Sequence, residues 1–496
     1  MSCKINRKQA FVLLEVLVLA LVSLWGLRFF ALPDAARLAV GLLAAYLPAR
    51  VLLARDHSAG VAARCWLLLT WAILGVMIAL SIDHCTGGDS AMMLHPRLMS
   101  DDRGYFDWAL SQLDPSVHRP HVTFVGYPLI ISLIWRVLGV HIVWPLVFNA
   151  MCVLLACVFT GKMTVTLVAP RDAKSSRWVM AAALMMCSML FFMLAHALKV
   201  LKDPACCVAT TAVGLALARF VAADTKSRAA WVKCLLLMTS GCLLMALVRT
   251  SYVYFFMLGV GLMTVAKWRA RWRRGLALLA VAVAAYAVGF CVSFYPFSQQ
   301  VSTISGGYPM QRIFITGYAQ QPYLEMIGQY FYYPVWKRLL LLPVTAGVQF
   351  IIPFPWIYNT SADGALLELF PRLRFMWYFV GGLVLFYYLF MSWRRGAGGL
   401  GVWALWPALV FLIIAYVVGG SVSRYVLPFE FMFIPMAVFV LYKVRNGEYR
   451  NAFVVWMIFY CLVLVSTLII CHEVQLEYLR EMSRYYREHA RHRLTP

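Results

Sequence analysis

Charged side chains are scarce in this chain, which has 496 residues of which only 13% are charged. Soluble domains carry about 25% charged and about 45–50% apolar residues, whereas 63% of this chain is hydrophobic. The composition therefore excludes a soluble globular enzyme and a disordered chain. Acidic residues are the scarcest charged type, at 21 against 44 Lys and Arg, and the formal net charge is +23.

The sequence also lacks the patterns of several other protein classes. Its apolar runs are near-continuous, without the residue-by-residue alternation of membrane β-strands, and no period of 20–50 residues repeats along the chain. The 13 cysteines show no disulfide-framework spacing, so we expect small buried apolar side chains. Those inside apolar runs include Cys152, Cys157, Cys187, Cys234, Cys242, Cys291 and Cys461.

Apolar runs of about 20 residues, each long enough to span a bilayer as a helix, recur from end to end. They predict an all-α polytopic membrane protein with about 13 transmembrane helices and outer-face loops. The predicted spans are 11–30, 35–54, 64–82, 143–169, 178–198, 204–222, 231–248, 250–266, 275–295, 373–391, 400–420, 425–442 and 452–471. Two further apolar segments, 124–140 and 339–357, contain prolines and are expected to be re-entrant or interfacial.

Basic residues set the expected orientation. Lys4, Arg7 and Lys8 precede the first span, so we expect a cytoplasmic N-terminus, an uncleaved first helix and a multi-pass protein of a bacterial-type inner membrane. Most of the net charge then flanks helices and meets membrane lipids, and a basic site for a lipid phosphate is the other explanation. Nucleic acid is not expected as a partner, because the basic residues form short clusters between helices.

These patterns divide the chain into six regions. Three N-terminal helices are followed by an outer acidic loop, central helices, a second outer loop with a re-entrant region, C-terminal helices and a basic tail. Their bounds are 1–82, 83–123, 124–295, 296–372, 373–471 and 472–496. The basic tail falls outside by alternation of the spans, although its arginines favour the inside.

The acidic loop 83–123 contains the residues best suited to chemistry, with six of the 21 acidic residues. Asp101 and Asp102 are adjacent, and Tyr105 and Ala109 follow at helical spacing, which predicts a short helix beginning near Asp101. A carboxylate there suits a helix start, or it could act as general base on an acceptor hydroxyl or amine. The second carboxylate could orient the acceptor or hold a divalent cation; no other cofactor is expected. His118 and His121 lack a supporting motif, so no zinc site is predicted.

Five short motifs together resemble the GT-C glycosyltransferases, which include protein O-mannosyltransferases and lipid A aminoarabinose transferases. The first is Asp101-Asp102-Arg-Gly-Tyr105 in an outer loop, followed by Gly126-Tyr127-Pro128-Leu129. Leu201-Lys202-Asp203-Pro204, Leu247-Val248-Arg249-Thr250-Ser251-Tyr252 and Arg424-Tyr425-Val-Leu-Pro428 resemble elements of relatives encoded among polysaccharide genes. The order of all five agrees over roughly residues 100–440.

The resemblance implies a GT-C-like fold and a transferase that takes a sugar from a polyprenyl-phosphate carrier. The acceptor would be a lipid, glycan or protein of the cell envelope, on the outer face. Asp102 or Asp101 would be the base, and Lys202, Arg249 and Arg424 would bind the phosphate, with Tyr105 and Tyr425 as further substrate-binding residues. Alternatively, each cation only meets lipid headgroups, and Lys202 pairs locally with Asp203.

Two other functions fit a chain of this composition. A polysaccharide polymerase or ligase would rely on Arg and His in a large late loop. A lipid-linked sugar flippase or transporter would carry ionisable residues near mid-membrane, whereas here they cluster at the ends of spans. The loop 296–338, rich in Tyr and Gln and containing Arg312 and Glu325, suits either sugar binding or an interfacial aromatic belt.

Overall fold

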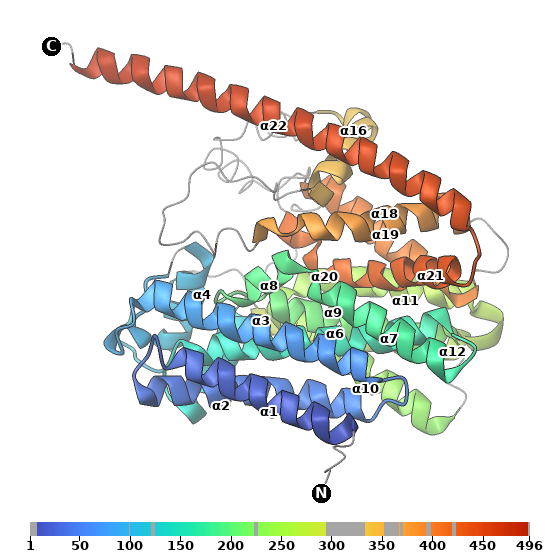
Figure 1. Ribbon diagram of the computed structural model, residues 1–496, viewed down its shortest axis with the longest axis horizontal. Helices are drawn as coiled ribbons and strands as arrows, with labels where there is room; N and C mark the ends of the chain where they lie inside the picture. Colours follow the sequence, from blue (N-terminus) through green and yellow to red (C-terminus); the bar gives the residue numbers. More distant parts are fainter. Residues whose placement is uncertain are drawn as a thin grey trace, which may run out of the picture. The chain divides into compact units, whose positions relative to one another are not determined.

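The structure, a computed structural model, describes residues 7–98, 100–120, 125–222, 227–293, 333–351, 367, 371–392, 398–418 and 423–494. Within these residues every regular element is a helix (Figure 1). The outer-loop residues of 296–332, and with them Arg312 and Glu325, lie outside this set. The chain forms two compact units, residues 1–295, 359–407 and 427–442 in the first and residues 296–358, 408–426 and 443–496 in the second.

The first unit contains most of the helices and all but two of the predicted site residues. From the N-terminus these helices are α1 (Arg7–Gly26), α2 (Leu32–Ala54), α3 (Val61–Thr86), η1 (Ala91–Met93), α4 (Ser100–Ser111), α5 (Gly126–Leu138), α6 (Val143–Val168), α7 (Ala173–Ser188), α8 (Phe191–Ala197), α9 (Asp203–Ala222), α10 (Arg228–Arg249), η2 (Thr250–Tyr252), α11 (Val253–Ala266) and α12 (Trp268–Ser293). Later in the chain come α18 (Phe375–Phe386), the π-helical turn η4 (Tyr387–Met391), α20 (Leu427–Glu430), η6 (Phe431–Phe433) and α21 (Ile434–Arg445).

The second unit holds α16 (Val335–Ile351), η5 (Ser423–Tyr425) and α22 (Arg450–Leu494), and α19 (Gly398–Val418) has residues in both units. Arg338 of α16 donates a 2.7 Å hydrogen bond to the hydroxyl of Tyr416 in α19. The helix α22 continues to Leu494, well beyond the predicted span 452–471. Many of its apolar side chains between Arg450 and Glu473 are exposed, as expected of a helix that meets lipid.

The prediction of many membrane-spanning helices is confirmed. Among the described residues ten helices are long and apolar enough to cross a membrane, or eleven if a bent pair counts as one. Three features explain why ten such helices are found where 13 spans were predicted. The segment 178–198 is the bent pair, α7 and α8 meeting at 62°. The segments 231–248 and 250–266 count as one stretch, Arg228–Ala266, and Phe375–Met391 is shorter than a full span.

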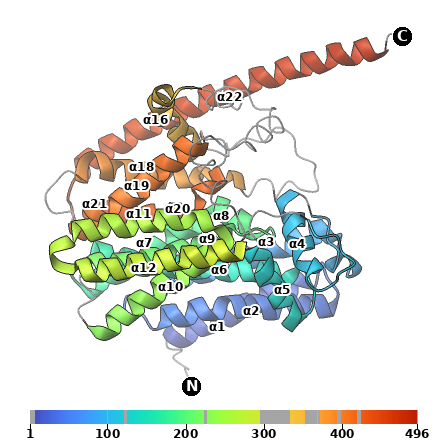
Figure 2. The same cartoon turned by 180° about the vertical axis from the view of Figure 1, so that it is seen from behind.

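The stretch Arg228–Ala266 is nevertheless divided at Arg249, whose backbone is not helical (φ −161°, ψ 75°). A straight helix of 39 residues would be about 58 Å long, almost twice a hydrocarbon core. The helix α12 packs against both α10 and α11, and Figure 2 shows the three helices side by side. The two predicted spans are therefore seen as the separate helices α10 and α11.

The centre of the first unit is α9, of which nearly every residue is buried. It packs most extensively against α6 and α10, and also against α8, α11 and α20. The close approach to α10 depends on Gly241, where an added Cβ would lie 2.8 Å from the carbonyl oxygen of Ala209. Small residues let helix backbones approach in membranes, where packing rather than the hydrophobic effect drives association.

Most cysteines are buried as predicted, but the prediction is wrong for Cys291 and Cys461. Both are exposed, on α12 and α22 respectively. An apolar run identifies a helix that meets either protein or lipid, and burial against protein requires a partner helix on that face. In α22 most residues from Arg450 to Glu473 are exposed or half-buried, and Cys461 is exposed like most of that stretch.

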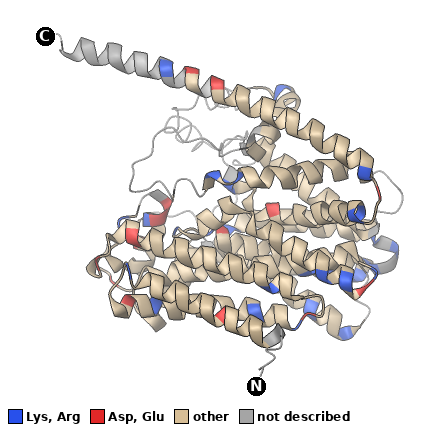
Figure 3. Ribbon diagram, viewed as in Figure 1, with Lys and Arg blue, Asp and Glu red and all other residues tan. Residues whose placement is uncertain are grey.

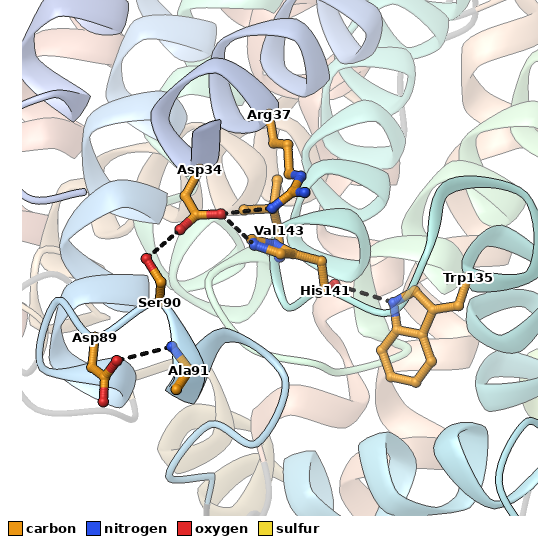
Figure 4. A network of polar contacts seen from close by, with 8 residues as sticks. All are labelled: Asp34, Arg37, Asp89, Ser90, Ala91, Trp135, His141 and Val143. Atoms are coloured by element: carbon orange, nitrogen blue, oxygen red, sulfur yellow. Dashed lines mark hydrogen bonds and ion pairs between the residues drawn. The ribbon is translucent and has the colours of Figure 1, made fainter. Parts of the chain in front are cut away.

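A network of polar contacts fastens the segment before α4 to the helix bundle (Figure 4). Asp34, near the start of α2, accepts hydrogen bonds from Ser90 (2.7 Å), Arg37 (2.8 Å) and His141 (3.2 Å). The Nδ1 atom of His141 accepts from the backbone N–H of Val143 at 3.3 Å. Its Nε2 atom therefore carries the hydrogen that faces Asp34, which makes the imidazole neutral in this arrangement. Burial lowers the pKa of His141, against the opposing effect of Asp34.

We expect this network to weaken in acid. Because the pKa of His141 is lowered in the folded protein, the unfolded chain binds more protons below about pH 6.5, and stability falls as the pH drops from there through the folded pKa. His141→Gln keeps a side-chain donor but cannot titrate. Between about pH 7.5 and about pH 5.5, the thermal unfolding midpoint in detergent should fall more for the wild type than for His141→Gln.

His57, which is exposed, supplies the control, since His57→Gln should retain the wild-type pH dependence. An equal loss of stability in wild type and His141→Gln would contradict the role given to His141.

Candidate functional site

The acidic pair lies where the sequence predicted a short helix. Asp101 and Asp102 occupy the first turn of α4, and both side chains are half-buried. Tyr105 and Ala109, which follow on the same face of the helix, are buried. Carboxylates in a first helical turn are stabilised by the helix dipole, so this position alone is compatible with both roles considered for the pair.

A chain of contacts runs from α4 into the bundle. The rings of Tyr105 and Tyr127 meet edge to face with centroids 5.6 Å apart. The hydroxyl of Tyr127 donates to Asn149 of α6 at 3.1 Å, and the amide of Asn149 donates to the backbone carbonyl of Lys199 at 2.7 Å. Burial raises the pKa of Tyr127 well above its usual value, and the negative charge of Asp102 contributes to the shift. Asp102 belongs to the same helix as Tyr105, three positions before it.

The segment between α8 and α9 is held at two carbonyls. Asn149 binds that of Lys199, and the hydroxyl of Ser81 in α3 donates to that of Leu198 at 2.8 Å. This brings Lys202 to the ring of Tyr105, with 5.5 Å between the ammonium nitrogen and the ring centroid. An ammonium near an aromatic face is attracted to the π electrons. Two predicted site residues far apart in the sequence are thus neighbours.

Arg249 approaches the same place from the end of α10. Its Nη1 atom lies 3.8 Å from Oδ1 of Asp203, the first residue of α9, and its guanidinium lies 4.2 Å from the centroid of the Tyr252 ring. Lys202, Asp203 and Arg249 are all buried. A buried charge is strongly unfavourable unless it is paired, which explains why Asp203 stands opposite Arg249. The sequence alone had offered Lys202 as the partner of Asp203.

A second buried ion pair was missed by sequence reasoning. Arg374, just before α18, pairs with Glu430 of α20, and both side chains are almost completely buried. A signal was present, because Glu430 falls inside the predicted span 425–442, and an acidic residue in a span usually has a polar partner. The partner could not be identified, because 56 positions separate the two residues.

The two ion pairs are linked through aromatic rings. Tyr252, which lies under Arg249, contacts Phe429 with centroids 5.8 Å apart, and Phe429 precedes Glu430. On the other side, the guanidinium of Arg374 lies 4.8 Å from the ring centroid of Phe192 in α8, and Phe192 contacts His196 at 4.6 Å. From His196 the chain leads directly into the segment that carries Lys202. These contacts and the chain between them therefore connect both ion pairs with the segment that leads into α9.

We call the five buried charged residues of this region the α9 charge cluster: Lys202, Asp203, Arg249, Arg374 and Glu430. It holds three cations and two carboxylates, so its formal charge is +1. Among the described residues the other buried carboxylates, Glu15 and Asp34, belong to α1 and α2 and have their own partners, Arg50 and Arg37. Figure 3 shows most remaining Lys and Arg at helix ends and in connections.

Arg424 and Tyr425 belong to the second unit, in the short helix η5. The guanidinium of Arg424 lies 5.8 Å from the ring centroid of Tyr425. Their assignment to substrate binding therefore stays a prediction. Of the histidines considered for zinc, His118 is exposed and His121 lies outside the described residues. Over the described part of the chain, no three His, Cys, Asp or Glu side chains group so that they could hold a metal ion.

The approach of α5 to α10 positions Tyr127 beside this cluster, and it requires glycine at position 126. A Cβ there would lie 2.1 Å from the carbonyl oxygen of Leu247, two residues before Arg249. We expect Gly126→Ala to force the two backbones apart and to destabilise the protein by about 1–3 kcal/mol. A lower thermal unfolding midpoint in detergent would show this.

Gly261, within α11, is the matched control because a Cβ at that position meets no atom within 4 Å. Gly261→Ala should leave the midpoint unchanged or raise it, since alanine favours a helix by about 1 kcal/mol. Equal midpoints for Gly126→Ala and the wild type would contradict the close approach.

This arrangement separates two kinds of charge. Half-buried carboxylates at the start of α4 can exchange protons with a solvated group, whereas the buried cations provide positive charge in a low-dielectric setting, where they bind anions most strongly. Comparisons of the chain with protein-family models, curated proteins and solved structures give no match. The functional argument therefore starts from these side chains.

Proposed function

We propose that the protein is a membrane glycosyltransferase of GT-C type, which moves a sugar from a polyprenyl-phosphate carrier to a cell-envelope acceptor. The observation that carries the proposal is the link between the acidic pair and the buried cations. Tyr105, three positions after Asp102, contacts Lys202, and Lys202 is followed by Asp203, the partner of Arg249. Base and anion-binding groups of one reaction need to be neighbours in this way.

In the proposed reaction the acidic pair accepts a proton, and the buried cations stabilise the leaving phosphate. A carboxylate, Asp102 or Asp101, accepts the proton of the acceptor hydroxyl or amine. The acceptor atom forms a bond to the anomeric carbon from the face opposite the phosphate, with inversion. The bond between that carbon and the phosphate oxygen breaks, and the electron pair leaves with the polyprenyl phosphate. Lys202 and Arg249 stabilise the negative charge that develops there.

The setting of the reaction follows from the predicted topology. In a multi-pass protein of an inner membrane with a cytoplasmic N-terminus, α4 and the start of α9 would face the outer side. The donor would be the polyprenyl-phosphate-linked sugar, and the acceptor a lipid, glycan or protein. Arg424 and Tyr425 would add contacts to the donor. A divalent cation held by the acidic pair is compatible with this scheme.

The acidic pair provides the decisive test. Asp101→Asn and Asp102→Asn keep the side-chain volume but remove the base, so we expect transfer to fall by roughly a hundredfold to ten-thousandfold for the residue that accepts the proton. Each variant is expressed in the source strain lacking the chromosomal gene, and cell-surface glycans are profiled at matched protein level in the membrane. The glycan species that disappears identifies the acceptor.

Asp107 is the matched control. It lies on the same helix, and its carboxylate accepts from Arg103 in an exposed pair at 3.3 Å. Asp107→Asn should leave the glycan profile intact. If both Asp101→Asn and Asp102→Asn restore every glycan that the deletion removes, the pair is structural and the transferase mechanism is wrong. Movement of lipid-linked sugar across vesicles without transfer would then favour a flippase.

A further inference from the structure

Arg374 is held in place by contacts on two sides. Its Nη2 atom donates to Glu430, and the ring of Phe192 lies 4.8 Å from the centre of the guanidinium. The side chain is 1% exposed. These contacts fix the guanidinium plane without occupying all of its donors, because a guanidinium carries five N–H groups and Glu430 takes only Nη2.

The remaining nitrogens of Arg374 are the notable feature. Nε and Nη1 are both buried, and among the described residues neither has a hydrogen-bond partner. Buried donors of a charged group are rarely left unsatisfied, because their desolvation is not compensated. Water or a ligand with acceptor atoms would satisfy these donors.

Charge favours an anionic ligand. The α9 charge cluster holds three cations and two carboxylates, so its formal charge is +1. Arg374 is connected to Arg249 through Phe429 and Tyr252, and to Lys202 through Phe192 and His196. A guanidinium with free N–H groups matches the oxygens of a phosphate better than an ammonium does.

We propose that Arg374, positioned by Glu430, donates hydrogen bonds to a phosphate group that binds at the α9 charge cluster. The chemistry is that of an oxyanion, and the lipid monophosphate of the proposed donor or a free phosphate could supply it. The choice of the lipid rests on the proposed function. Arg374 is a binding residue in this scheme, additional to Lys202 and Arg249, and its role is to hold the phosphate before and after transfer.

The test compares binding of three probes to the purified protein in detergent: a polyprenyl monophosphate, the corresponding polyprenyl alcohol and inorganic phosphate. Replacing Arg374 alone would leave Glu430 buried without a partner, so the main variant is the double substitution Arg374→Gln with Glu430→Gln. We expect it to bind the lipid phosphate roughly tenfold to a hundredfold more weakly, with unchanged binding of the alcohol.

The matched control neutralises another Arg–Glu pair, in which Glu15 is buried and Arg50 is half-buried. Glu15 and Arg50 join α1 to α2 at 2.5 Å, and Glu15→Gln with Arg50→Gln should leave lipid-phosphate binding unchanged. A second variant, Arg374→Lys, keeps the charge and the contact with Glu430 but lacks the fork of donors, so it should also lose affinity. If the double variant aggregates in detergent, Arg374→Lys alone tests the loss of lipid-phosphate binding.

Each outcome decides the proposal. Selective loss of lipid-phosphate binding supports it. Wild-type affinity in the double variant and in Arg374→Lys would overturn it, and the unpartnered nitrogens would then be bound to water. Equal binding of lipid phosphate and alcohol by the wild type would overturn both the phosphate site and the proposed donor. Inorganic phosphate binding as tightly as the lipid would support the oxyanion site and reject the lipid as its source. The Asp102→Asn profile tests the transferase separately.

Discussion

Burial of charge at the beginning of α9 is the constraint on which the rest of the first unit depends. An unpaired buried ion is strongly unfavourable, so Asp203 needs Arg249 and Glu430 needs Arg374. These pairs join helices from widely separated parts of the sequence, and removal of one partner would leave the other uncompensated. A fully apolar interior would pack equally well in a bilayer, since buried ion pairs seldom add net stability over hydrophobic residues. The proposed phosphate ligand would account for buried charges that packing alone does not require.

The surrounding packing makes this arrangement rigid. Asn149 and Ser81 fix the carbonyls of the segment before α9, and Gly126 lets α5 meet the end of α10. The network of Asp34, Ser90 and His141 fastens the segment before α4 in the same way. Each of these contacts joins segments that are distant in sequence. Different contacts therefore hold the acidic pair of α4 and the buried cations in place. The two groups are connected at Tyr105, which belongs to α4 and contacts Lys202.

Much of the fold could be predicted from the sequence because lipid imposes a simple rule of length and apolarity on each helix. The same rule does not say which helices pack against one another or which side chains form pairs. It could not reveal that Cys461 lies on an exposed helix, that α7 and α8 are bent at 62°, or that Glu430 pairs with Arg374. The short helix beginning near Asp101 was predictable from local spacing. The approach of Lys202 and Arg249 to one site was only a hypothesis, since it depends on how α9 and α10 pack.

The contrast in burial between the two charge groups also bears on mechanism. In the proposed mechanism the general base must release its proton after each turnover, and the half-buried position of Asp101 and Asp102 would keep that exchange open. A leaving phosphate is stabilised best where water is excluded and the positive charge is already oriented, which describes Arg249 and Arg374. If the two groups exchanged environments, a buried carboxylate would tend to stay protonated and exposed cations would be screened by salt. The distribution of burial is therefore itself an argument for proton transfer at α4 and anion binding at α9.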